Sequence, residues 1–434
     1  MEFVLSFLLL ALNLIAFQFG INQYIFLFAS TVIFATLFWL CFRKSKNFLA
    51  TCLMMFCHTW QISWMNILGT STEYLQLPWF YLVGVLCVMY ALFNFNTVLK
   101  KDLSAFFLVT FICLIIISVF PLIKSPSITE GLKEFIMIIF FLVMVFIGFL
   151  FQDSISSENR DRVLDAYTWC VFLSSIFIIL QYMAYSQLGL RLFNFDVGIY
   201  MDNDTASASL LMGDPSSATI MLGSAVFICI SRIEKKKNVL FNSACILLTV
   251  IGMALTTRRT SIVSLVIILA LYALFHYKNP LAKIVSVVLF AIVGAVMLYY
   301  LLQSRPVDDL SQYLYDNQRF ANYTRVLEVS STHPFGVGYD GVYSNSFMSD
   351  NIAPHNTALR WTLMGGYWFT ILMLTVLFKT VSKGFKKNLS AEYWILIYAI
   401  FASNFIPDIL NARFLIIPCM CAFLFAKAEK TKAI

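Results

Sequence analysis

Residues 303–366 read QSRPVDDLSQYLYDNQRFANYTRVLEVSSTHPFGVGYDGVYSNSFMSDNIAPHNTALRWTLMGG, the longest polar interval in an otherwise apolar chain. The interval contains four arginines and two of the four histidines of the protein: Arg305, Arg319, Arg325, Arg360, His333 and His355. Long loops in compact proteins are usually either functional or disordered. The aromatic residues and the helix and turn signals in this interval argue against disorder, so we expect a folded, functional loop.

The rest of the chain has the composition of a membrane protein. Of 434 residues, 60% are hydrophobic and 12% are charged, and the mean hydropathy is +0.81; soluble domains have about 25% charged residues. Apolar runs of roughly 20 residues, enough for a helix to cross a hydrocarbon core, recur from end to end. These runs lack the alternation of barrel strands. The sequence therefore predicts an all-α polytopic membrane protein with about 14 transmembrane helices.

The predicted spans divide the chain into three regions. Residues 1–302 would form helices 1–11, residues 303–358 the large loop with its short helices, and residues 359–434 helices 12–14 and a tail. The predicted spans are 3–19, 22–42, 48–68, 79–98, 104–123, 134–152, 165–184, 213–231, 239–256, 260–277, 283–302, 359–379, 391–408 and 411–427.

The basic residues predict the orientation. With a cytoplasmic N-terminus, 20 of the 30 lysines and arginines face the cytoplasm and 10 face outward, as the positive-inside rule leads us to expect. Both termini would then be cytoplasmic and the large loop extracytoplasmic. The first segment carries Glu2 where a secretory signal would carry lysines, so we interpret it as a retained helix. The net charge of +7 comes largely from short loops and does not indicate nucleic-acid binding, and the ten cysteines show no disulfide or zinc pattern.

The two faces differ in the type of basic residue that they use. Sixteen of the 20 inward residues are lysine, whereas eight of the 10 outward residues are arginine: Arg191, Arg258, Arg259, Arg305, Arg319, Arg325, Arg360 and Arg413. A planar guanidinium group suits bidentate binding of phosphate or carboxylate. We therefore expect an anion site on the outer face. The alternative for individual arginines is pairing with acidic neighbours in the loop, namely Asp308, Asp309, Asp316 or Glu328.

The short turn TTRRT, residues 256–260, places Arg258 and Arg259 side by side between two hydrophobic segments. Two like charges close to a helix N-terminus, which itself carries partial positive charge, are unfavourable without an anion. Helix N-termini also bind phosphate readily. The turn is thus a candidate diphosphate site, and the alternative is that both side chains extend to lipid headgroups.

Within the loop, residues 316–330 have helical periodicity, with Phe320, Tyr323 and Leu327 on one face, and the segment from Pro334 to Gly338 is expected to be a flexible turn. Pro-His-Asn at 354–356 then opens the twelfth helix. A histidine in a first helical turn is disfavoured as imidazolium. His355 is therefore a candidate general base, although a lone histidine is more often structural.

These motifs resemble the bacterial O-antigen polymerase and ligase superfamily (Wzy/WaaL). The resemblance rests on TTRRTSIV, on QRFANYTRVLEVSSTHPFGVGY, on PHNTALRWTLMGG and, more loosely, on GDPSSATIML around Asp214. It implies a GT-C-type, metal-independent glycosyltransferase without a cofactor, in the bacterial inner membrane. Its donor would be an undecaprenyl-diphosphate-linked glycan at the periplasmic face, and a polysaccharide co-polymerase that regulates chain length would be its partner. The doublet Arg258-Arg259 departs from the single arginine of many members.

The resemblance and the residue chemistry together predict the roles of the site residues. Arg258 and Arg319 would stabilise the departing diphosphate, and His355 would accept the proton of the acceptor hydroxyl. No metal ligand is predicted. The predicted substrate-binding residues are Arg259, Arg325, Tyr323, Asn356, Arg360, Asp214 and His333. Tyr323 could instead be a packing residue of the loop helix.

The sequence favours a polymerase but leaves alternatives open. A polymerase transfers the growing chain to the next lipid-linked repeat unit, whereas an O-antigen ligase transfers it to lipid A-core. The lack of similarity in the N-terminal half favours the polymerase, whose substrate varies between serotypes. A lipid-linked sugar flippase is a third possibility, but we find no internal repeat and only His58 well inside a span.

Overall fold

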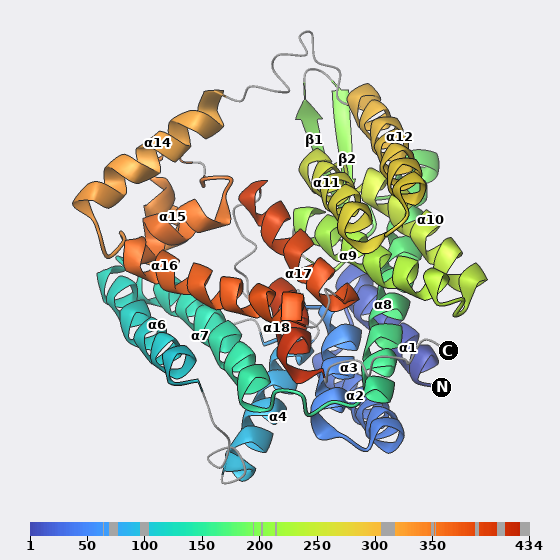
Figure 1. The fold of residues 1–434 in the computed structure, drawn as a ribbon, viewed down its shortest axis with the longest axis horizontal. Coiled ribbons are helices and arrows are strands. Elements are labelled where there is room, and N and C mark those ends of the chain that lie inside the picture. The colour runs from blue at the N-terminus through green and yellow to red at the C-terminus, as the bar shows by residue number, and fades with distance from the viewer. Residues whose placement is uncertain are drawn as a thin grey trace. The chain divides into compact units, whose positions relative to one another are not determined.

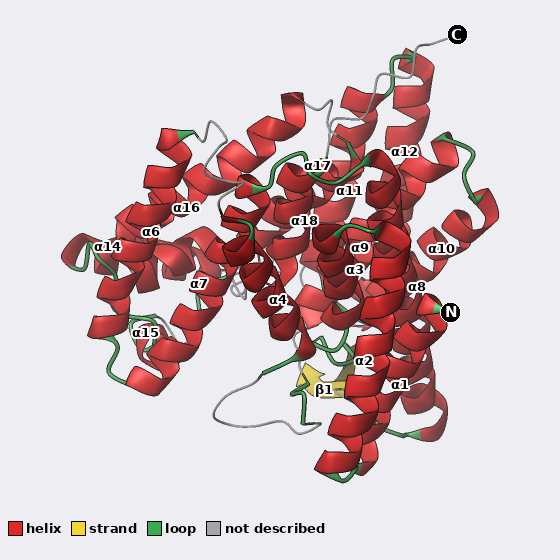
Figure 2. Cartoon of the chain, turned by 90° about the horizontal axis from the view of Figure 1, so that it is seen from below, coloured by secondary structure: helices red, strands yellow, loops and turns green. Residues whose placement is uncertain are grey.

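The computed structural model describes residues 1–63, 65–68, 77–95, 104–193, 195–200, 203–212, 215–304, 317–348, 351, 353–386, 390–405 and 413–425, and most of them are helical (Figures 1 and 2). At residues 195–200, 203–205, 259, 300–304, 317–320, 385–386 and 413–414 it describes the backbone alone. The chain divides into two compact units.

Unit 1 comprises Met1–Cys87, Ile155–Pro306 and Lys427–Ile434. Its described elements are α1 (Glu2–Phe19), α2 (Gln23–Ser45), α3 (Phe48–Trp60), α8 (Ser157–Leu188), α9 (Pro215–Glu234), α10 (Val239–Leu255), α11 (Arg259–His276), α12 (Pro280–Ser304), β1 (Phe195–Tyr200) and β2 (Asn203–Ala208). Helix α8 is central, since it contacts α1, α3, α9, α10 and β2. Side-chain caps start several of these helices: Asn47 accepts from the Ala50 amide and Ser156 from the Asn159 amide.

The charged loops of unit 1 meet at one end of its helices. Lys44 pairs with Glu2 at 2.8 Å, so the end of α2 is joined to the start of α1. Arg232 at the end of α9 pairs with Asp165 of α8 at 2.7 Å. These residues lie in or beside the loops that the sequence assigns to the cytoplasm, and their clustering agrees with alternating helix directions within the unit.

The interior of unit 1 is apolar, with a small polar group around His58. The His58 ring is buried in α3, with Nδ1 2.9 Å from the Ser6 hydroxyl and 3.4 Å from the sulfur of Cys170. His58 is therefore a packed interior side chain of unit 1.

Unit 2 comprises Val88–Ser154 and Val307–Ala426. Its described elements are α6 (Ala105–Lys124), α7 (Ile128–Leu150), α14 (Asn317–Thr332), α15 (Gly341–Asn345), α16 (Thr357–Lys386), α17 (Ala391–Ala402), η2 (Ser403–Phe405) and α18 (Arg413–Leu424), while α4 (Trp79–Phe93) runs across the boundary between the units. Helix α16 contacts α6, α14, α17 and α18, and α7 contacts α6 and α18. Phe107, Phe149 and Phe423 form an aromatic cluster among these helices.

Each predicted span overlaps a helix in the described residues, but the helices differ in length. Eight are long and apolar enough to cross a membrane, and five further apolar helices have 10–17 residues. The short ones include Phe48–Trp60, which ends well before the predicted residue 68. The chain is thus a mostly helical protein with several candidate membrane spans, and the count of fourteen crossings stays a prediction.

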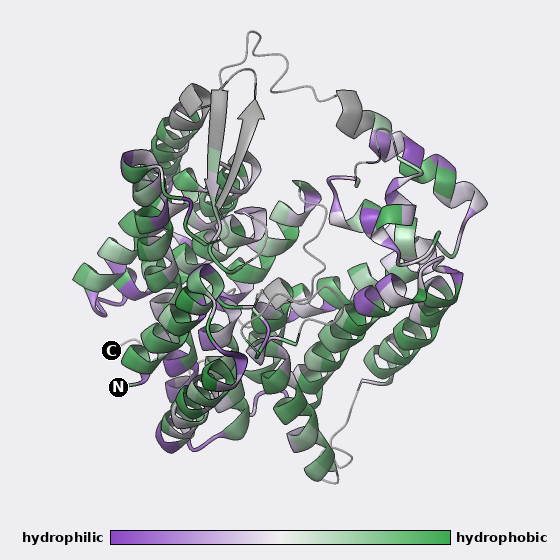
Figure 3. Cartoon of the chain, turned by 180° about the vertical axis from the view of Figure 1, so that it is seen from behind, coloured by the Kyte–Doolittle hydropathy of each residue, from purple (hydrophilic) through white to green (hydrophobic). Residues whose placement is uncertain are grey.

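Hydrophobic residues make up most of the long helices (Figure 3). In α12, only 11% of the apolar stretch within Pro280–Tyr299 is buried against protein. Its side chains Ile284, Val288 and Ile292 are each at least 50% exposed. An apolar face of this size on a soluble protein would be unusual. It suits contact with lipid.

The mostly helical structure is consistent with the predicted all-α fold, but it also contains one β-hairpin that was not predicted. Strands β1 and β2 pair antiparallel, with Phe195 opposite Ala208 and Tyr200 opposite Asn203 (Figure 2). The hairpin lies in the segment that the sequence assigns to the outer face. Its first strand, FDVGIY, alternates apolar residues with Asp196 and Gly198, which is the period-two pattern of a strand.

Candidate functional site

The first candidate region is the arginine turn of unit 1, where α10 ends and α11 begins. Thr257 adopts a positive φ of 56°, and Arg258 occupies the N-cap position of α11 with an extended backbone. A residue other than glycine at positive φ usually needs support from its surroundings. Here the Thr257 hydroxyl lies 2.6 Å from the Ser207 hydroxyl of β2. The hairpin therefore anchors the residue immediately before Arg258.

The start of α9 anchors the same turn from a second direction. The hydroxyls of Thr219 and Thr256 lie 2.6 Å apart, and both residues are fully buried. Thr219 also donates to the carbonyl of Pro215, the first residue of α9. The structure thus brings residues 215–219 of the GDPSSATIML segment to the arginine turn. Asp214 itself lies outside the described residues.

The two arginines of the turn occupy different helix positions. Arg258 precedes α11 and is half-buried, whereas Arg259 is the first residue of the helix and its side chain is not among those described. The unpaired amides of the first helical turn point in the direction of this end. The turn therefore combines a guanidinium group with a helix N-terminus, a combination that can bind an anion.

The second candidate region is the folded loop of unit 2, whose main helix is α14. Its buried face consists of Asn322, Val326, Val329 and Ser330, while Leu327 is 51% exposed. The buried side is therefore not the predicted face that contained Leu327. Val326 and Val329 pack with Val337, Met348 and Leu363, so a small apolar core joins α14 to the first turns of α16.

The turn at residues 334–338 is docked against α16, which corrects the prediction of a flexible turn. Helix α16 is kinked at Gly366, where φ is 86° and ψ is 173°. The Val337 amide donates to the Leu363 carbonyl at 2.9 Å, and the Tyr367 amide donates to the Pro334 carbonyl at 3.1 Å. The turn thereby pairs with backbone groups that a helix kink would leave unsatisfied.

The other side of this turn rests on the connection between α6 and α7. The Tyr339 amide donates to the Ser125 hydroxyl at 2.8 Å, and the Lys124 ammonium donates to the Gly336 carbonyl at 3.4 Å. The Tyr339 side chain is 1% exposed. Burial, with a further contribution from the negative charge of Glu134, raises the pKa of Tyr339 well above its ordinary value.

His355 lies at a corner where α14 meets the start of α16. The Tyr323 hydroxyl donates to the His355 carbonyl at 3.1 Å. Asn356 caps α16, since its side-chain oxygen accepts from the Leu359 amide at 3.0 Å. The helix begins at Thr357, so His355 precedes the cap and does not lie in the first turn as predicted. The half-buried residue still lies two positions before α16, close to the positive end of the helix.

Arg360 also belongs to this corner, and Asn404 borders it. Arg360, one turn after Asn356, is 8% exposed, and its Nη2 lies 3.5 Å from the position that a Cβ on Gly341 would occupy. Asn404 of η2 accepts a hydrogen bond from the Asn356 amide group at 3.4 Å. The structure therefore brings Tyr323, His355, Asn356 and Arg360 together. Asn404 has no local sequence signal that points to this corner, since 48 residues separate it from Asn356.

The remaining predicted site residues of the loop have structural contacts. Arg325 pairs with Glu328 at 3.0 Å and donates from Nε to the Phe347 carbonyl at 3.2 Å. His333 directly follows α14, with Nδ1 2.9 Å from the Thr332 hydroxyl and its ring in a T-shaped contact with Phe347. For Arg325 this is the acidic pairing considered as the alternative. Arg319 lies one turn before Tyr323 on α14, and its side chain is not among those described.

Among the described residues, no group of three or more histidine, cysteine, aspartate and glutamate side chains is arranged to hold a metal ion. The polar groups that the described residues of the two regions offer include guanidinium groups, helix N-termini, amides and two imidazoles, those of His333 and His355. Such groups stabilise negative charge and accept or donate protons.

These features define a class of protein: a mostly helical membrane protein with an arginine turn in one unit and, in the other, a folded loop before a kinked helix. Residues 244–374 match the family model described as O-antigen ligase. The matched segment contains the arginine turn, α14, the docked glycine turn, the His355 corner and the kink of α16. The match confirms the resemblance to the O-antigen polymerase and ligase superfamily (Wzy/WaaL). No curated protein matches the chain.

Members of this family are glycosyltransferase-like enzymes that act on lipid-linked glycans. The match therefore supports an activity of the O-antigen ligase or polymerase type for this chain, in lipopolysaccharide biosynthesis, and does not separate the two.

Proposed function

We propose that the protein is an O-antigen polymerase of the GT-C type, which joins undecaprenyl-diphosphate-linked repeat units at the periplasmic face of the bacterial inner membrane. The observation that carries the proposal is the His355 corner, which lies within the segment that matches the family. There Tyr323 holds the backbone carbonyl of His355, next to a capped helix end and one turn before a buried arginine, Arg360. An imidazole at this corner can accept a proton.

The proposed reaction is a displacement at the anomeric carbon of the donor glycan. A hydroxyl oxygen of the acceptor sugar forms the new glycosidic bond, and its proton passes to the imidazole of His355. The bond between the anomeric carbon and the diphosphate breaks, and the electron pair leaves with undecaprenyl diphosphate. Diphosphate is a good leaving group, so this reaction needs positive charge at the departing oxygens rather than a carboxylic acid.

In this proposal the arginines supply that charge. Arg258 and Arg319 bind the diphosphate, with Arg259 close in the chain to Arg258. A guanidinium group placed beside a helix N-terminus stabilises a phosphoryl oxygen by charge and by directed hydrogen bonds. This assignment uses the setting of Arg258 at the start of α11 and the family resemblance.

The other residues of the corner hold His355 and the acceptor. Tyr323 fixes the His355 carbonyl, and Asn356 fixes the start of α16. Arg360 is buried beside Gly341 and one turn from Asn356, where a guanidinium group can orient a sugar hydroxyl or a phosphate. Undecaprenyl-linked glycans and a chain-length-regulating co-polymerase are the proposed partners.

The test of this function is the lipopolysaccharide pattern of a strain that lacks the gene. A polymerase deletion leaves a single repeat unit on lipid A-core, and the intact gene restores a ladder of bands. If lipid A-core carries no repeat unit while polymer accumulates on the lipid carrier, the chain is a ligase. If unpolymerised units stay on the cytoplasmic side of the membrane, the chain is a flippase and the catalytic roles proposed above are wrong.

A further inference from the structure

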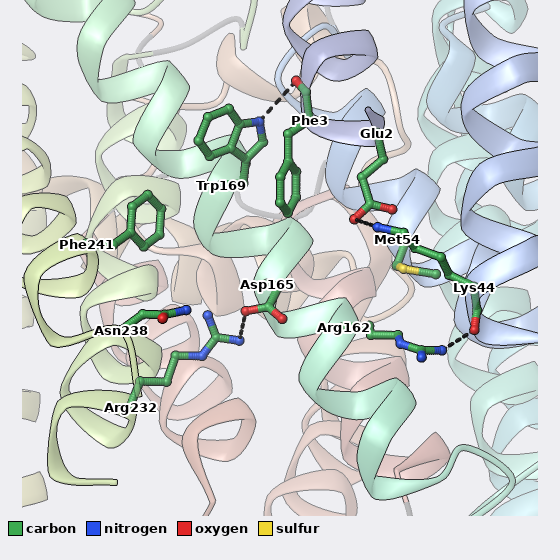
Figure 4. A pocket seen from close by; sticks show the side chains of 10 residues that line it. All are labelled: Glu2, Phe3, Lys44, Met54, Arg162, Asp165, Trp169, Arg232, Asn238 and Phe241. Atoms are coloured by element: carbon green, nitrogen blue, oxygen red, sulfur yellow. Dashed lines mark hydrogen bonds and ion pairs between the residues drawn. The ribbon is translucent and has the colours of Figure 1, made fainter. Parts of the chain in front are cut away.

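A cavity of about 610 Å³ opens at the charged end of unit 1. Its volume lies within the roughly 300–1,000 Å³ of small-molecule sites. Figure 4 shows side chains from α1, α2, α3, α8, α9 and α10 around it. The lining residues are Glu2, Phe3, Lys44, Met54, Arg162, Asp165, Trp169, Arg232, Asn238 and Phe241. None of them takes part in the proposed sugar transfer.

Two cationic side chains of the cavity, Arg232 and Lys44, have more N–H donors than they use in the contacts described. Arg232 donates from Nη2 to Asp165 at 2.7 Å and to the Asp161 carbonyl at 3.1 Å, and a guanidinium group carries five N–H groups. The Lys44 ammonium contacts Glu2 at 2.8 Å and is 53% exposed. By contrast, Arg162 is engaged by Glu158, Asn159 and the Lys44 carbonyl. Arg232 and Lys44 can therefore bind an incoming anion.

Glu2 gives the cavity a negatively charged group beside these two cations. One of its carboxylate oxygens accepts from Lys44, and the other is buried with no hydrogen-bond partner among the described residues. A buried charged oxygen without a donor is costly. A ligand that brings an N–H donor into the cavity would relieve this cost.

The remaining wall of the cavity is apolar. Trp169 packs against Phe3 with ring centroids 4.9 Å apart and against Phe241 at 6.3 Å. Its indole N–H is already bonded to the Phe3 carbonyl, so the ring offers an apolar surface. Met54 extends this surface. The cavity thus combines both signs of charge with a hydrocarbon wall, at the end of a bundle of apolar helices.

We propose that this cavity binds a glycerophospholipid through a phosphate and an amine, as in the aminoethyl-phosphate headgroup of phosphatidylethanolamine. Arg232 and Lys44 bind the phosphate, Glu2 accepts from the ammonium group, and an acyl chain lies against Trp169 and Phe241. Basic pockets between transmembrane helices at a membrane surface bind lipid headgroups in the same way. The buried oxygen of Glu2 favours a headgroup that contains a hydrogen-bond donor.

The experiment is a lipid titration of the full-length, detergent-purified protein, followed by native mass spectrometry. Phosphatidylethanolamine, phosphatidylglycerol and phosphatidylcholine with identical acyl chains are compared, with inorganic phosphate and free phosphoethanolamine as competitors. We expect phosphatidylethanolamine to bind most tightly and free phosphoethanolamine to compete only weakly. Equal binding of the three lipids would overturn the proposal. So would full displacement of the lipid by inorganic phosphate, because the site would then be one for free phosphate.

Three variants test the assigned contacts. Arg232→Gln should weaken the binding of phosphatidylethanolamine and phosphatidylglycerol by about tenfold, the effect of one charge-assisted hydrogen bond. Glu2→Gln should weaken phosphatidylethanolamine alone, which keeps the test valid if Arg232→Gln fails to fold. Arg43→Gln is the control, since Arg43 adjoins Lys44 but contacts Trp39 and does not line the cavity. Unchanged lipid selectivity in Glu2→Gln would overturn the assignment of the amine.

Discussion

Gly336 and Gly366 pack backbone to backbone with no room for a side chain on either. A Cβ on Gly336 would lie 2.1 Å from the Met364 carbonyl oxygen, and one on Gly366 would lie 2.3 Å from the Pro334 carbonyl oxygen. Both glycines also have positive φ, 75° and 86°. The kink of α16 and the turn at 334–338 therefore depend on each other, and together they fix how the large loop is attached to unit 2.

The first prediction concerns these two glycines. Gly336→Ala and Gly366→Ala should each lower the apparent melting temperature of the purified protein and abolish the polymer ladder. Positive φ costs an alanine about 1–2 kcal/mol, and the forced shift of packed backbone adds about 1–3 kcal/mol. The measurements are fluorescence-detected thermal unfolding and the lipopolysaccharide ladder.

Gly189→Ala is the matched control for this prediction. Gly189 has a φ of 65° but no atom within 4 Å of its Cβ position, so its substitution introduces the backbone strain without the clash. If Gly336→Ala is no less stable than Gly189→Ala, the docked turn is not a tight backbone contact.

The second prediction concerns the hydrogen bond from Tyr323 to His355. Tyr323→Phe removes the donor to the His355 carbonyl and leaves the ring in place. A hydrogen bond of this kind contributes about 0.5–1.5 kcal/mol, so we expect a loss of polymerisation rate of about three- to tenfold with little change in protein level. The rate is measured as the appearance of polymer with time after induction.

Tyr367→Phe is the control for Tyr323, because Tyr367 also donates to a backbone carbonyl of unit 2, that of Leu327, at 3.4 Å. Equal rates for the two variants would show that Tyr323 acts as an ordinary packing residue.

The third prediction compares the loss of activity on substitution of Arg258 with that on substitution of Arg325. Arg258→Ala should reduce activity by about 10²–10³, the usual effect of removing a preorganised charge donor. Arg325→Ala should have little effect, because Arg325 forms an exposed pair with Glu328 and such pairs contribute about 0–1 kcal/mol. The assay is the polymer ladder at matched membrane protein levels. A strong defect in Arg325→Ala together with a weak one in Arg258→Ala would contradict the assigned roles.

The fourth prediction concerns stability at alkaline pH. Burial raises the pKa of Tyr339 in the folded state, whereas a tyrosine in the unfolded chain keeps a pKa of about 10. Below about pH 10 the phenol is neutral in both states, and the contribution of this neutral group to folding is fully present. As the pH rises above about 10, the unfolded chain ionises first and this contribution is lost. Tyr339→Phe should therefore unfold at higher pH than the wild type.

The same variant should not be destabilised at neutral pH. The Tyr339 hydroxyl is buried with no hydrogen-bond partner among the described residues, and removing such a group is neutral or stabilising. Tyr343→Phe, at a partly exposed tyrosine of the same loop, is the control for both conditions. A clear loss of stability in Tyr339→Phe at pH 7 would mean that the hydroxyl is bonded.

The sequence predicts the parts of this structure that depend on local patterns. Apolar runs predict the helices because a backbone in lipid satisfies its own hydrogen bonds most simply in a helix. The periodicity of residues 316–330 predicts α14. The Pro-His-Asn motif at 354–356 predicts the start of α16, which begins at Thr357. The resemblance to the superfamily, carried by short motifs, is confirmed by the match over residues 244–374.

The features that escaped prediction depend on contacts between distant segments. Glycines at 336 and 338 favour a flexible turn when considered alone, but in the fold that turn is docked against Met364 and Gly366 on one side and Ser125 on the other. Asn404 has no sequence signal that links it to Asn356, because η2 and α16 meet only in the fold. The hairpin of β1 and β2 did carry a signal, the alternation in FDVGIY, but it is short beside the surrounding helices.

The most direct test of the central claim is polymerisation by the purified protein. Lipid-linked repeat units extracted from the deletion strain serve as both donor and acceptor, and products are separated by size. We expect wild-type protein, and the His276→Ala control at a histidine in unit 1 that pairs with Glu234, to form lipid-linked oligomers, and His355→Ala to form none while eluting as the same monodisperse species. Oligomers formed equally by His355→Ala, or none formed by well-folded wild-type protein, would contradict the account.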